Sequence, residues 1–411
     1  MPDPNDADRL RGPDASDDRP VRLDPQDPLG AGFAEAVGQA LARFGRVGAA
    51  ELRATSPELD ELARLALEAA AVGKRLRPAF CVWGYAAVGG SLEAPGGSAA
   101  AGALAQAESV RVADDSRPLA APGELIRAAA ALELLHAAEL VHDDVIDGSA
   151  TRHGRAAAHV QFARWHADAG GLGDSAAFGR AAAVLLGDLL LKQAYECFWT
   201  SGFDQASLRR AAPHWFAVER EVTAGQYLDL AAQTRDPLWL RREPAAGLAL
   251  IEQVVEHKTA RYTCLRPLLI GAALAGSNPA ADRALEAFGS ALGRAFQYRD
   301  DVLGVFGDPA VTGKPAGDDI REGKLTVLVA RAMSLVDEAD ARRLAGWLGS
   351  PAADVAAAGA LIESCGARQA VEDDIRAAHR QAVSALADAP IDDAGRRALL
   401  VLADTCVNRS A

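Results

Sequence analysis

An acidic motif ends an apolar stretch in the segment LVHDDVIDGSATRHG, where Asp143 and Asp147 stand four residues apart. In a helix this spacing puts both carboxylates on one face, about one turn from each other. Paired carboxylates suit Mg²⁺, which keeps several waters and takes phosphate oxygens as its remaining ligands. A frayed, solvated helix end gives the same pattern, so this motif alone leaves both interpretations open.

A second acidic pair, Asp300 and Asp301, lies in FQYRDDVLGVF, inside another long apolar segment with helical periodicity. If the two acidic helix faces confront each other, they form a binuclear or trinuclear metal site. The second pair therefore favours the metal interpretation of both motifs.

Basic residues accompany the acidic motifs. In GKRLRP, Lys74 and Arg77 are one helical turn apart and can grip a phosphate together. In GKPAGDDIREGK, a Gly- and Pro-rich loop mixes Lys314, Arg321 and Lys324 with acids, which suits closure over a charged ligand. A site for Mg²⁺ and a diphosphate needs this mixture, because oxyanions must meet both metals and cations.

The composition excludes several classes of protein. The chain has 411 residues, 50% of them hydrophobic, with 43 Lys and Arg against 56 Asp and Glu, a net charge of −13. This charge and the lack of a basic run exclude a general nucleic-acid binder. The five cysteines are scattered and form no CxxC pair, which predicts neither disulfides nor a zinc site, and we expect a reduced, cytoplasmic protein. The sequence shows no signal peptide and no membrane span.

The elements that must position these side chains are helices. Residues 1–28 hold eight Asp, four Arg and six Pro, and we expect a disordered acidic tail. Beyond it apolar residues recur at i, i+3 and i+4, and we predict one all-α domain over residues 29–411, with an inserted irregular loop at about 89–123. Such a length exceeds one solid core, which favours mostly antiparallel helices around a deep apolar cavity.

The motifs resemble those of the trans-isoprenyl diphosphate synthase (polyprenyl synthetase) family, including bacterial geranylgeranyl and farnesyl diphosphate synthases. The resemblance runs from about Gly30 to the C-terminus and rests on seven motifs in family order: GKRLRP, DDVID followed by RHG, GDLLL, GQYLDL, KTARYT, FQYRDD and GKPAGDD. It implies the isoprenoid synthase fold, with the two acidic motifs facing each other at the mouth of the cavity. It also implies a homodimer and Mg²⁺, three ions per active site.

The resemblance further implies a role for individual residues. The implied metal ligands, direct or through water, are Asp143, Asp144, Asp147, Asp300, Asp301 and Asp319. The implied substrate-binding residues are Arg152, Lys258 and Lys314 for an allylic diphosphate, Lys74, Arg77, His136 and His153 for isopentenyl diphosphate, and in addition Gln226 and Lys324. Lys258, Thr259 and Gln297 are the implied catalytic residues, since the dipoles of the last two can stabilise an allylic cation.

Some of these residues have plainer explanations. Gln226 and Asp229 can equally be a hydrogen-bonded pair that packs two helices, and His136 can be a core histidine with its polar atoms satisfied.

Two positions depart from the family pattern. His153 stands where a second arginine is usual, and Gly304 stands where the second motif usually ends in an acid. Asp308, in Gly-Asp-Pro, follows the expected helix end and is not counted as a substitute.

Product length is predicted from the helix before the first motif. Ala138, five residues before Asp143, is too small to stop chain growth, and the charge of Glu139 is expected to point toward another helix or solvent. Leu134 and Leu135, one turn deeper, are the candidate floor of the cavity. These residues predict a C20 product.

The sequence therefore predicts a Mg²⁺-dependent prenyltransferase that joins isopentenyl diphosphate head to tail to an allylic diphosphate, giving geranylgeranyl diphosphate. The alternatives are a longer-chain or C15 synthase, a class I terpene cyclase, and a non-catalytic partner subunit of a prenyl synthase.

Overall fold

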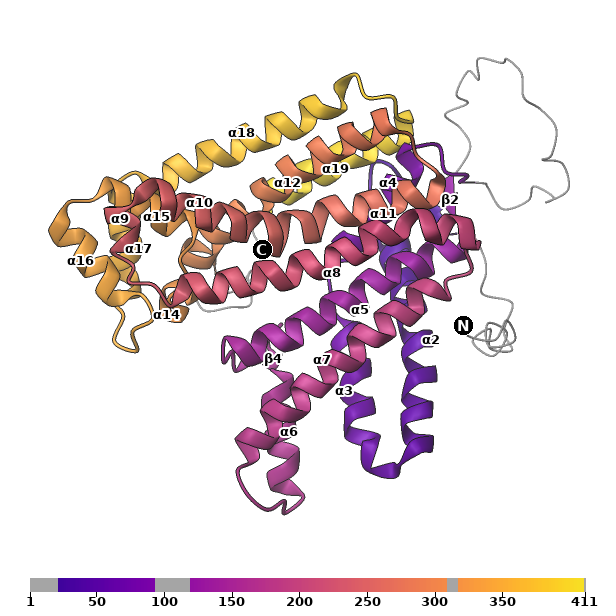
Figure 1. Cartoon of the computed structure of the whole chain (residues 1–411), viewed down its shortest axis with the longest axis horizontal. Coiled ribbons are helices and arrows are strands. Elements are labelled where there is room, and N and C mark those ends of the chain that lie inside the picture. The colour runs from indigo at the N-terminus through magenta and orange to yellow at the C-terminus, as the bar shows by residue number, and fades with distance from the viewer. Residues whose placement is uncertain (1–20, 93–118, 309–316, 410–411) are drawn as a thin grey trace, which may run out of the picture.

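The computed structural model describes residues 21–92, 119–308 and 317–409. Helices make up most of these residues (Figure 1). In the first half they are α2 (Ala31–Thr55), the 3₁₀ turn η2 (Pro57–Leu59), α3 (Asp60–Ala71), α4 (Leu76–Ala87), α5 (Gly123–Ile146), α6 (Ala158–Asp168), α7 (Ser175–Trp199) and α8 (Gln205–Gln233). In the second half they are α9 (Trp239–Arg242), α10 (Pro244–Val254), η3 (Val255–Leu265), α11 (Arg266–Ala275), α12 (Pro279–Phe306), α14 (Asp318–Glu322), α15 (Val327–Leu335), α16 (Glu338–Trp347), α17 (Val355–Ser364), α18 (Ala367–Ala387) and α19 (Asp393–Asn408).

Helix α5 runs through the middle of the molecule and packs against α2, α4 and α7 (Figure 1). Its apolar residues lie on all sides of the helix, and fourteen of its residues are buried. A helix that is apolar all round is stable only inside a protein. The central place of α5 therefore follows from its sequence, and it fixes where the acidic end of the helix emerges.

A second packed group places the other acidic motif. Helix α12 lies between η3 and α18, and α4 packs against α11. The largest fully buried side chains include Trp83, Trp215, Phe80, Phe198 and Phe288, and the rings of Phe198 and Trp215 stack with centroids 4.3 Å apart. These contacts form one core that joins both helix groups.

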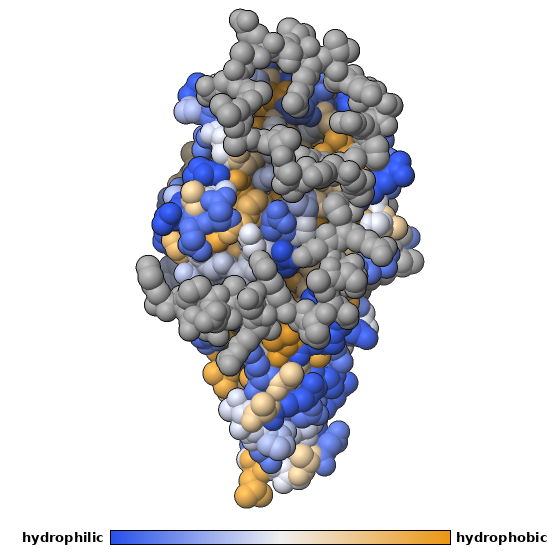
Figure 2. All heavy atoms as spheres, turned by 90° about the vertical axis from the view of Figure 1, so that its right-hand side faces the viewer, coloured by the Kyte–Doolittle hydropathy of each residue, from blue (hydrophilic) through white to orange (hydrophobic). Residues whose placement is uncertain are grey.

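Two helical arms extend from this body at the bottom of Figure 1, one made of α2 and α3 and the other of α6 and part of α7. Seen from the side, the lower part of the molecule has a mostly hydrophilic surface with small hydrophobic areas (Figure 2). Within the described residues, no helix is both long and apolar enough to span a membrane.

Two short antiparallel ladders were not expected. Strand β1 (Val21–Leu23) pairs with β2 (Leu119–Ala121), and β3 (Thr151–Arg152) pairs with β4 (Arg155–Ala156). The first ladder corrects two predicted boundaries. The expected tail ended at residue 28, but the ordered chain already includes β1 at residues 21–23, and the last part of the expected loop over about 89–123 is strand β2. The pairing joins segments about a hundred residues apart, and no local pattern shows it. Most of the expected tail and loop, residues 1–20 and 93–118, lie outside the described residues.

Candidate active site

The first acidic motif lies at the end of α5. Asp143 and Asp144 belong to its last turns, and the helix ends at Asp147, whose N–H donates to the carbonyl of Asp143 at 2.8 Å. Oδ2 of Asp147 is buried and accepts no hydrogen bond, and the ammonium of Lys324 lies 3.3 Å from it. The helix end therefore presents a buried carboxylate oxygen whose neighbour is the cation Lys324.

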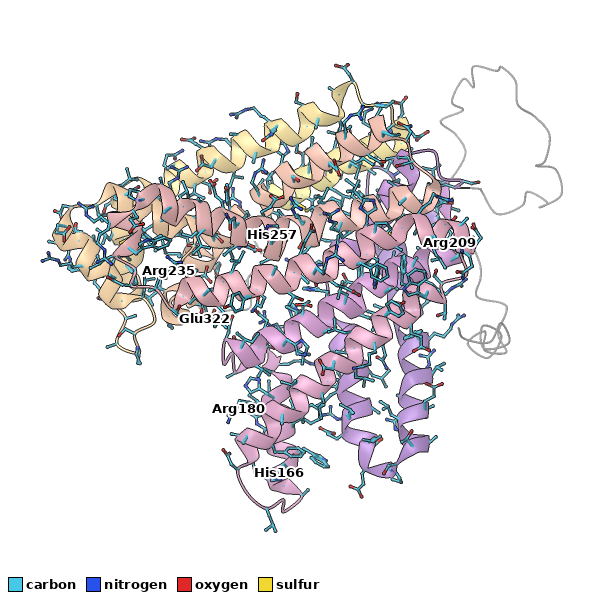
Figure 3. All side chains as sticks on the ribbon, viewed as in Figure 1. His166, Arg180, Arg209, Arg235, His257 and Glu322 are labelled. Carbon is cyan, nitrogen blue, oxygen red and sulfur yellow. The ribbon has the colours of Figure 1, made fainter. Side chains whose placement is uncertain are left out.

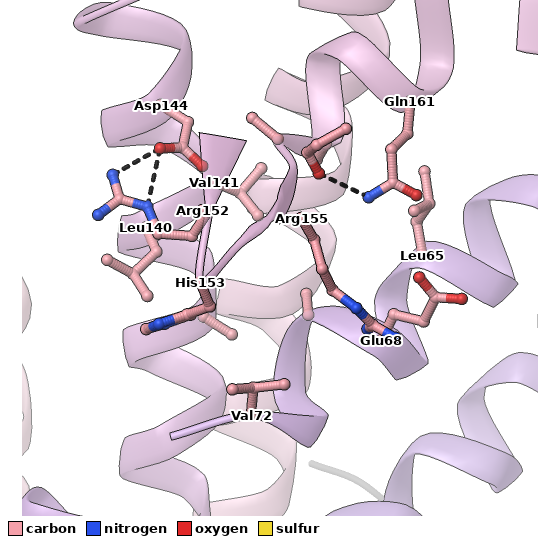
Figure 4. A pocket seen from close by; sticks show the side chains of 15 residues that line it. Leu65, Glu68, Val72, Leu140, Val141, Asp144, Arg152, His153, Arg155 and Gln161 are labelled. Atoms are coloured by element: carbon pink, nitrogen blue, oxygen red, sulfur yellow. Dashed lines mark hydrogen bonds and ion pairs between the residues drawn. The ribbon is translucent and has the colours of Figure 1, made fainter. Parts of the chain in front are cut away.

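A tight hairpin follows this helix end. Its two turn residues, His153 and Gly154, have φ angles of 50° and 73°. Positive φ at both positions is the type I′ geometry, which histidine adopts more readily than most residues. Figure 4 shows His153 and Arg155 at the border of a pocket whose other side chains include Val72 and Leu140.

The hairpin turns Arg152 back onto the motif. Its Nε donates to Oδ1 of Asp144 at 2.9 Å, and its Nη2 donates to Oδ2 of Asp143 at 3.3 Å. Burial raises the pKa of Asp144 despite this partner. The predicted diphosphate ligand Arg152 is thus paired with the two carboxylates.

Lys258 approaches Asp143 from another element. Its Nζ lies 2.6 Å from Oδ2 of Asp229 and 3.3 Å from Oδ1 of Asp143, which also accepts from Nε2 of Gln226 at 2.9 Å. Burial acts to lower the pKa of Lys258, but the carboxylates of Asp229 and Asp143 outweigh this effect and raise it. Lys258, Lys324 and Arg152 in turn lower the pKa of Asp143. Gln226 and Asp229 thus each bond to a residue of another helical element, and both the ligand role and the helix-packing role of this pair stay predictions.

Close backbone approaches bring Lys258 into place. Between α10 and α11 the chain forms η3, an 11-residue π-helical segment that carries Lys258. A Cβ on Gly225 of α8 would overlap the backbone of Lys258, and one on Gly293 of α12 would overlap Ala260. Small residues at these positions let both helices pack directly on η3. Segments of π-helix are common at functional sites.

The second acidic motif is linked to η3 by a chain of hydrogen bonds. Oγ1 of Thr259 donates to Oε1 of Gln297 at 2.6 Å, and Nε2 of Gln297 donates to Oδ1 of Asp301 at 2.7 Å. The other oxygen of Asp301 accepts from the N–H of Val327 at 3.2 Å. Complete burial, only partly offset by these donors, raises the pKa of Asp301 to about 8.

Helix α14 joins the two motifs. Nζ of Lys324 lies 2.6 Å from Glu322 and 3.3 Å from Asp147, and Ser149 lies 3.5 Å from Glu322. Glu322 is labelled in Figure 3, beside the end of α8. Burial opposes the charge of Lys324, but Asp319, Asp147 and Glu322 raise its pKa. The segment after the second motif therefore contacts the end of the first.

A cluster of cations lies beside Asp300. Arg409 forms an ion pair with Asp300, its guanidinium lies 3.8 Å from the ring centroid of Phe296, and burial together with its charge lowers the pKa of Lys74. Nε of Arg77 and Nε of Arg409 are buried and donate no hydrogen bond. Buried donors of this kind need an acceptor, which an anion would supply.

The turn that carries Lys74 and Arg77 is held by the residue between them. Arg75 has a φ of 58°, and its Nη1 donates to Oε2 of Glu133 in α5 at 2.9 Å. Its Nη2 donates to the carbonyl of Ala71 at the end of α3, also at 2.9 Å. Arg75 and Glu133 are 6% and 3% exposed, and breaking a buried pair costs about 3–5 kcal/mol. This pair fixes the turn against α5.

His136 lies next to this cluster. Burial, followed by the charges of Arg77 and Arg152, lowers its pKa well below the usual value, so the ring is neutral. Nδ1 of His136 lies 3.2 Å from the hydroxyl of Tyr262, and Arg77 stacks on the Tyr262 ring at 4.3 Å. His136 is a polar neighbour of the cations and carries no charge of its own.

The wall below the first motif carries Glu139. Of the two expected directions, another helix or solvent, the side chain takes the first: it is mostly buried, its nearest charges include Arg77 and Lys258, and burial raises its pKa to about 7. Ala138 and Leu135 are 0% exposed, so no space that water can reach adjoins them.

One predicted residue cannot be placed, and two residues beside the site were not predicted. Lys314 lies outside the described residues. Arg409 and Tyr262 were missed, although Tyr262 lies in the KTARYT motif, one helical turn after Lys258. Arg409 follows α19 at the end of the described chain, and nothing in its local sequence indicates a partner 109 residues away at Asp300.

The donor set fits Mg²⁺, which prefers carboxylate oxygens. Within residues 21–92, 119–308 and 317–409, however, no three acidic, histidine or cysteine side chains converge as a preformed metal site. The carboxylates instead form ion pairs with Arg152, Lys258, Lys324 and Arg409. Arginine and lysine side chains are also the cations that bind a diphosphate.

The chain is similar to a known protein family over most of its length. The sequence profile described as polyprenyl synthetase matches residues 59–365. A short chain isoprenyl diphosphate synthase of Methanothermobacter thermautotrophicus is 33% identical over 229 residues, covering 56% of this chain and 62% of that protein, less than two thirds of its length. A geranylgeranyl diphosphate synthase of Mycobacterium tuberculosis is 34% identical over 276 residues, covering 65% of this chain and 70% of that protein.

The fold has a solved counterpart. A geranylgeranyl pyrophosphate synthase of Corynebacterium glutamicum, crystallised with isoprenyl diphosphate and magnesium, superposes with a TM-score of 0.78 and 32% identity, over 94% of this chain and 100% of that one. The likeness covers nearly the whole chain and not one motif alone.

Proposed function

The chain belongs to the polyprenyl synthetase family, and on that premise we propose that it joins isopentenyl diphosphate head to tail to an allylic diphosphate and releases pyrophosphate. The observation that carries the proposal is the position of Lys324. It belongs to the segment that follows the second acidic motif, yet its ammonium lies 3.3 Å from Asp147 of the first. One diphosphate can therefore contact groups from both motifs.

The first substrate site lies over the α5 end. In this proposal Arg152 and Lys258 bind the allylic diphosphate. Each now forms an ion pair with Asp143, and the diphosphate would take the place of that carboxylate as their negatively charged partner. Asp143 and Asp147 on one side and Asp300, Asp301 and Asp319 on the other would hold Mg²⁺. When bound, Mg²⁺ supplies electrostatic stabilisation of the departing diphosphate.

The second substrate site lies in the cation cluster. Lys74, Arg77 and Arg409 bind isopentenyl diphosphate, supported by the two buried guanidinium Nε atoms that donate to no acceptor. Neutral His136 contributes a hydrogen bond without a charge. Such a site distinguishes this reaction from that of a terpene cyclase, which has no second diphosphate to bind.

The reaction needs orientation and charge, and no protein nucleophile. Cations on the allylic diphosphate favour ionisation of its carbon–oxygen bond, and the double bond of isopentenyl diphosphate attacks the allylic cation. Thr259 and Gln297 lie on one hydrogen-bonded chain, which orients their dipoles toward developing positive charge. Loss of a proton to the departing pyrophosphate completes the condensation.

We propose geranylgeranyl diphosphate, C20, as the product. Ala138 carries no bulk that would stop a growing chain, and Glu139, with a pKa of about 7, is only partly ionised near neutral pH and so tolerates a neighbouring hydrocarbon chain better than a full charge would. Replacing Glu139 with Phe narrows this wall, and we expect this variant to shift the product toward C15. Ala138 is 0% exposed, so Ala138→Phe would crowd the packed core instead.

We also propose a homodimer. On α8 the exposed side chains Phe216, Tyr227 and Leu230 recur at helical spacing, and on α7 Leu185 and Tyr195 are exposed. Helices α7 and α8 lie uncovered in the view of Figure 1. Exposed large apolar side chains on neighbouring helices support an interface there. The cytoplasmic location remains a prediction.

The test is a product assay. Purified protein is incubated with Mg²⁺, labelled isopentenyl diphosphate and a C5, C10 or C15 allylic primer, and the products are sized after dephosphorylation. We expect C20 as the main product, and at least about a hundredfold less labelled product when Asp143→Asn replaces the wild type. A wild-type protein that elongates no primer would refute the proposed function.

A further inference from the structure

Helix α19 ends beside the second acidic motif, and Arg409 follows its last residue. The guanidinium of Arg409 pairs with Asp300 and lies on the ring of Phe296, and its Nη2 donates to the carbonyl of Phe296 at 3.1 Å. Chain ends of this kind are poorly ordered unless other residues tie them down. The place of Arg409 therefore depends on what holds the end of α19.

A side chain of another helix holds this end. Nε of Arg299, in α12, donates to the carbonyl of Val407 at 2.9 Å. Val407 is 6% exposed and lies in the last turn of α19, where carbonyls have no partner within the helix. A guanidinium suits this position, because cations are favoured at helix C-termini. Arg299 therefore caps α19 two residues before Arg409.

Glu372 of α18 fixes the guanidinium of Arg299 in turn. Nη1 and Nη2 of Arg299 donate to the two carboxylate oxygens of Glu372 at 2.6 and 2.8 Å. The side chains are 18% and 21% exposed, so solvent has little access to the pair. Two parallel bonds fix the plane of a guanidinium, and with it the direction of Nε. Glu372 therefore directs Arg299 toward the carbonyl of Val407.

The pair lies outside the proposed substrate and metal sites. The hydrogen bonds of Arg299 go to Glu372 and Val407, and neither residue is assigned to a substrate or a metal. Asp300, the next residue of α12, points about 100° further round the helix and carries the ion pair with Arg409. An effect of Glu372 on substrate binding therefore passes through the helices that Arg299 connects.

We propose that Arg299 and Glu372 are positioning residues for isopentenyl diphosphate: they hold the end of α19 and so place the guanidinium of Arg409 against this substrate. The inference rests on the proposed function, which assigns Arg409 to the second substrate site. A residue of α18 without a substrate contact then sets the affinity for one substrate only. The allylic diphosphate, which Arg152 and Lys258 bind, is not affected.

The experiment is a double-mutant cycle on the full-length chain. It measures the Kd of isopentenyl diphosphate by isothermal titration calorimetry, and KM for each substrate. The variants are Glu372→Gln, which keeps the size of the side chain and removes its charge, Arg409→Gln, and the double variant. Asp374→Asn is the matched control, because Asp374 lies on the same helix and pairs at 2.9 Å with Arg331 of α15.

We expect Glu372→Gln to weaken isopentenyl diphosphate binding about threefold, within the range of coupling between residues of one network, and to act less strongly than Arg409→Gln. It has no further effect in the Arg409→Gln background, because the cation that it positions is then absent. KM for the allylic primer and the Kd of the control variant stay as in the wild type.

Arg299→Lys provides the same test if Glu372→Gln does not fold. Lysine keeps the positive charge, but its ammonium does not reproduce the planar fork that bonds both oxygens of Glu372 and the carbonyl of Val407. We expect the same loss of affinity for isopentenyl diphosphate, and again no further loss in the Arg409→Gln background.

Three results would overturn the inference. They are wild-type affinity for isopentenyl diphosphate in Glu372→Gln, a threefold loss that persists in the Arg409→Gln background, and an equal change for both substrates, which shows a general loss of structure. Failure of the proposed function looks different. In that case the wild type itself binds no isopentenyl diphosphate, and the inference falls with it.

Discussion

Asp143 of the first acidic motif and Asp301 of the second are the same residue type but are held in opposite electrostatic states. At the end of α5, Asp143 contacts the cations Lys258 and Arg152, and its pKa is lowered. On α12, Asp301 accepts hydrogen bonds from the side chain of Gln297 and the N–H of Val327, both neutral donors, and its pKa is about 8. One carboxylate is ionised at neutral pH, and the other retains its proton.

This difference shows that an acidic sequence motif does not determine its own charge. The surrounding elements do so: η3 and the hairpin bring Lys258 and Arg152 to Asp143, while α12 and α15 surround Asp301 with amides. The cations that now pair with Asp143 can therefore bind a diphosphate in its place. Asp301 gains its full negative charge when a cation enters, because a cation favours the ionised carboxylate.

The largest expected effect comes from removing one motif. We expect Asp143→Ala or Asp300→Ala to lower turnover by at least about a hundredfold, the scale for losing a main electrostatic element of catalysis. The measurement is kcat with saturating substrates and Mg²⁺. Near-normal kcat in both variants would contradict a site built from two motifs.

The protonated state of Asp301 predicts a pH dependence of stability. Between about pH 4 and pH 8 the unfolded chain releases this proton more readily than the folded chain, so stability falls as pH rises. Asp301→Asn removes this loss, on the order of 3 kcal/mol, in urea unfolding at pH 5 and pH 8 with EDTA present.

Asp143→Asn is the matched control for that measurement. The pKa of Asp143 is lowered, so its stabilisation is complete above the ordinary aspartate pKa and is lost only in more acidic solution. We expect this variant to keep the wild-type difference between pH 5 and pH 8. An unchanged difference in Asp301→Asn would show that Asp301 is ionised like Asp143.

Arg409 forms an ion pair with Asp300 of the second motif and also belongs to the cation cluster that contains Lys74 and Arg77. We expect Arg409→Gln to raise KM for isopentenyl diphosphate about tenfold, the effect of losing a charge-assisted contact of about 1.4 kcal/mol, with a smaller change in kcat. Arg376→Gln, at an exposed position of α18, is the control. If kcat falls and KM does not change, Arg409 acts on Asp300 alone.

The smallest effect is expected in the hairpin beside the first motif. His153→Arg supplies a permanent cation, and we expect KM for isopentenyl diphosphate to fall a few-fold and to depend less on pH. The left-handed turn position limits the gain, since a larger side chain there is strained. An unchanged KM would show that position 153 does not contact this substrate.

The sequence predicted the regular parts of this structure well. Helical periodicity predicted that the second acidic motif lies in a long helix, and α12 spans Pro279–Phe306 with an apolar stripe, an Asn278 cap and a Gly after its end. The π-helical turns of η3 were not predicted, since they depend on the close approach of α8 and α12. The β1–β2 ladder was missed because its pairing is long-range.

The same division applies to the site. Asp143 and Asp300 were predicted from the spacing of their acidic motifs, and Lys258 was predicted from the resemblance of its motif to the family. Arg409 and the inward orientation of Glu139 depend on which helices pack together. No sequence pattern reports that packing, and both features became visible only in the folded chain.

The central claim is that both acidic motifs serve one site, and a double-mutant cycle tests it most directly. The measurement is kcat for the wild type, Asp143→Asn, Asp300→Asn and the double variant. Residues that act as a unit give strongly non-additive losses, so we predict that the double variant is little slower than either single variant. If the two losses multiply, the motifs act independently and the account of a single site is wrong.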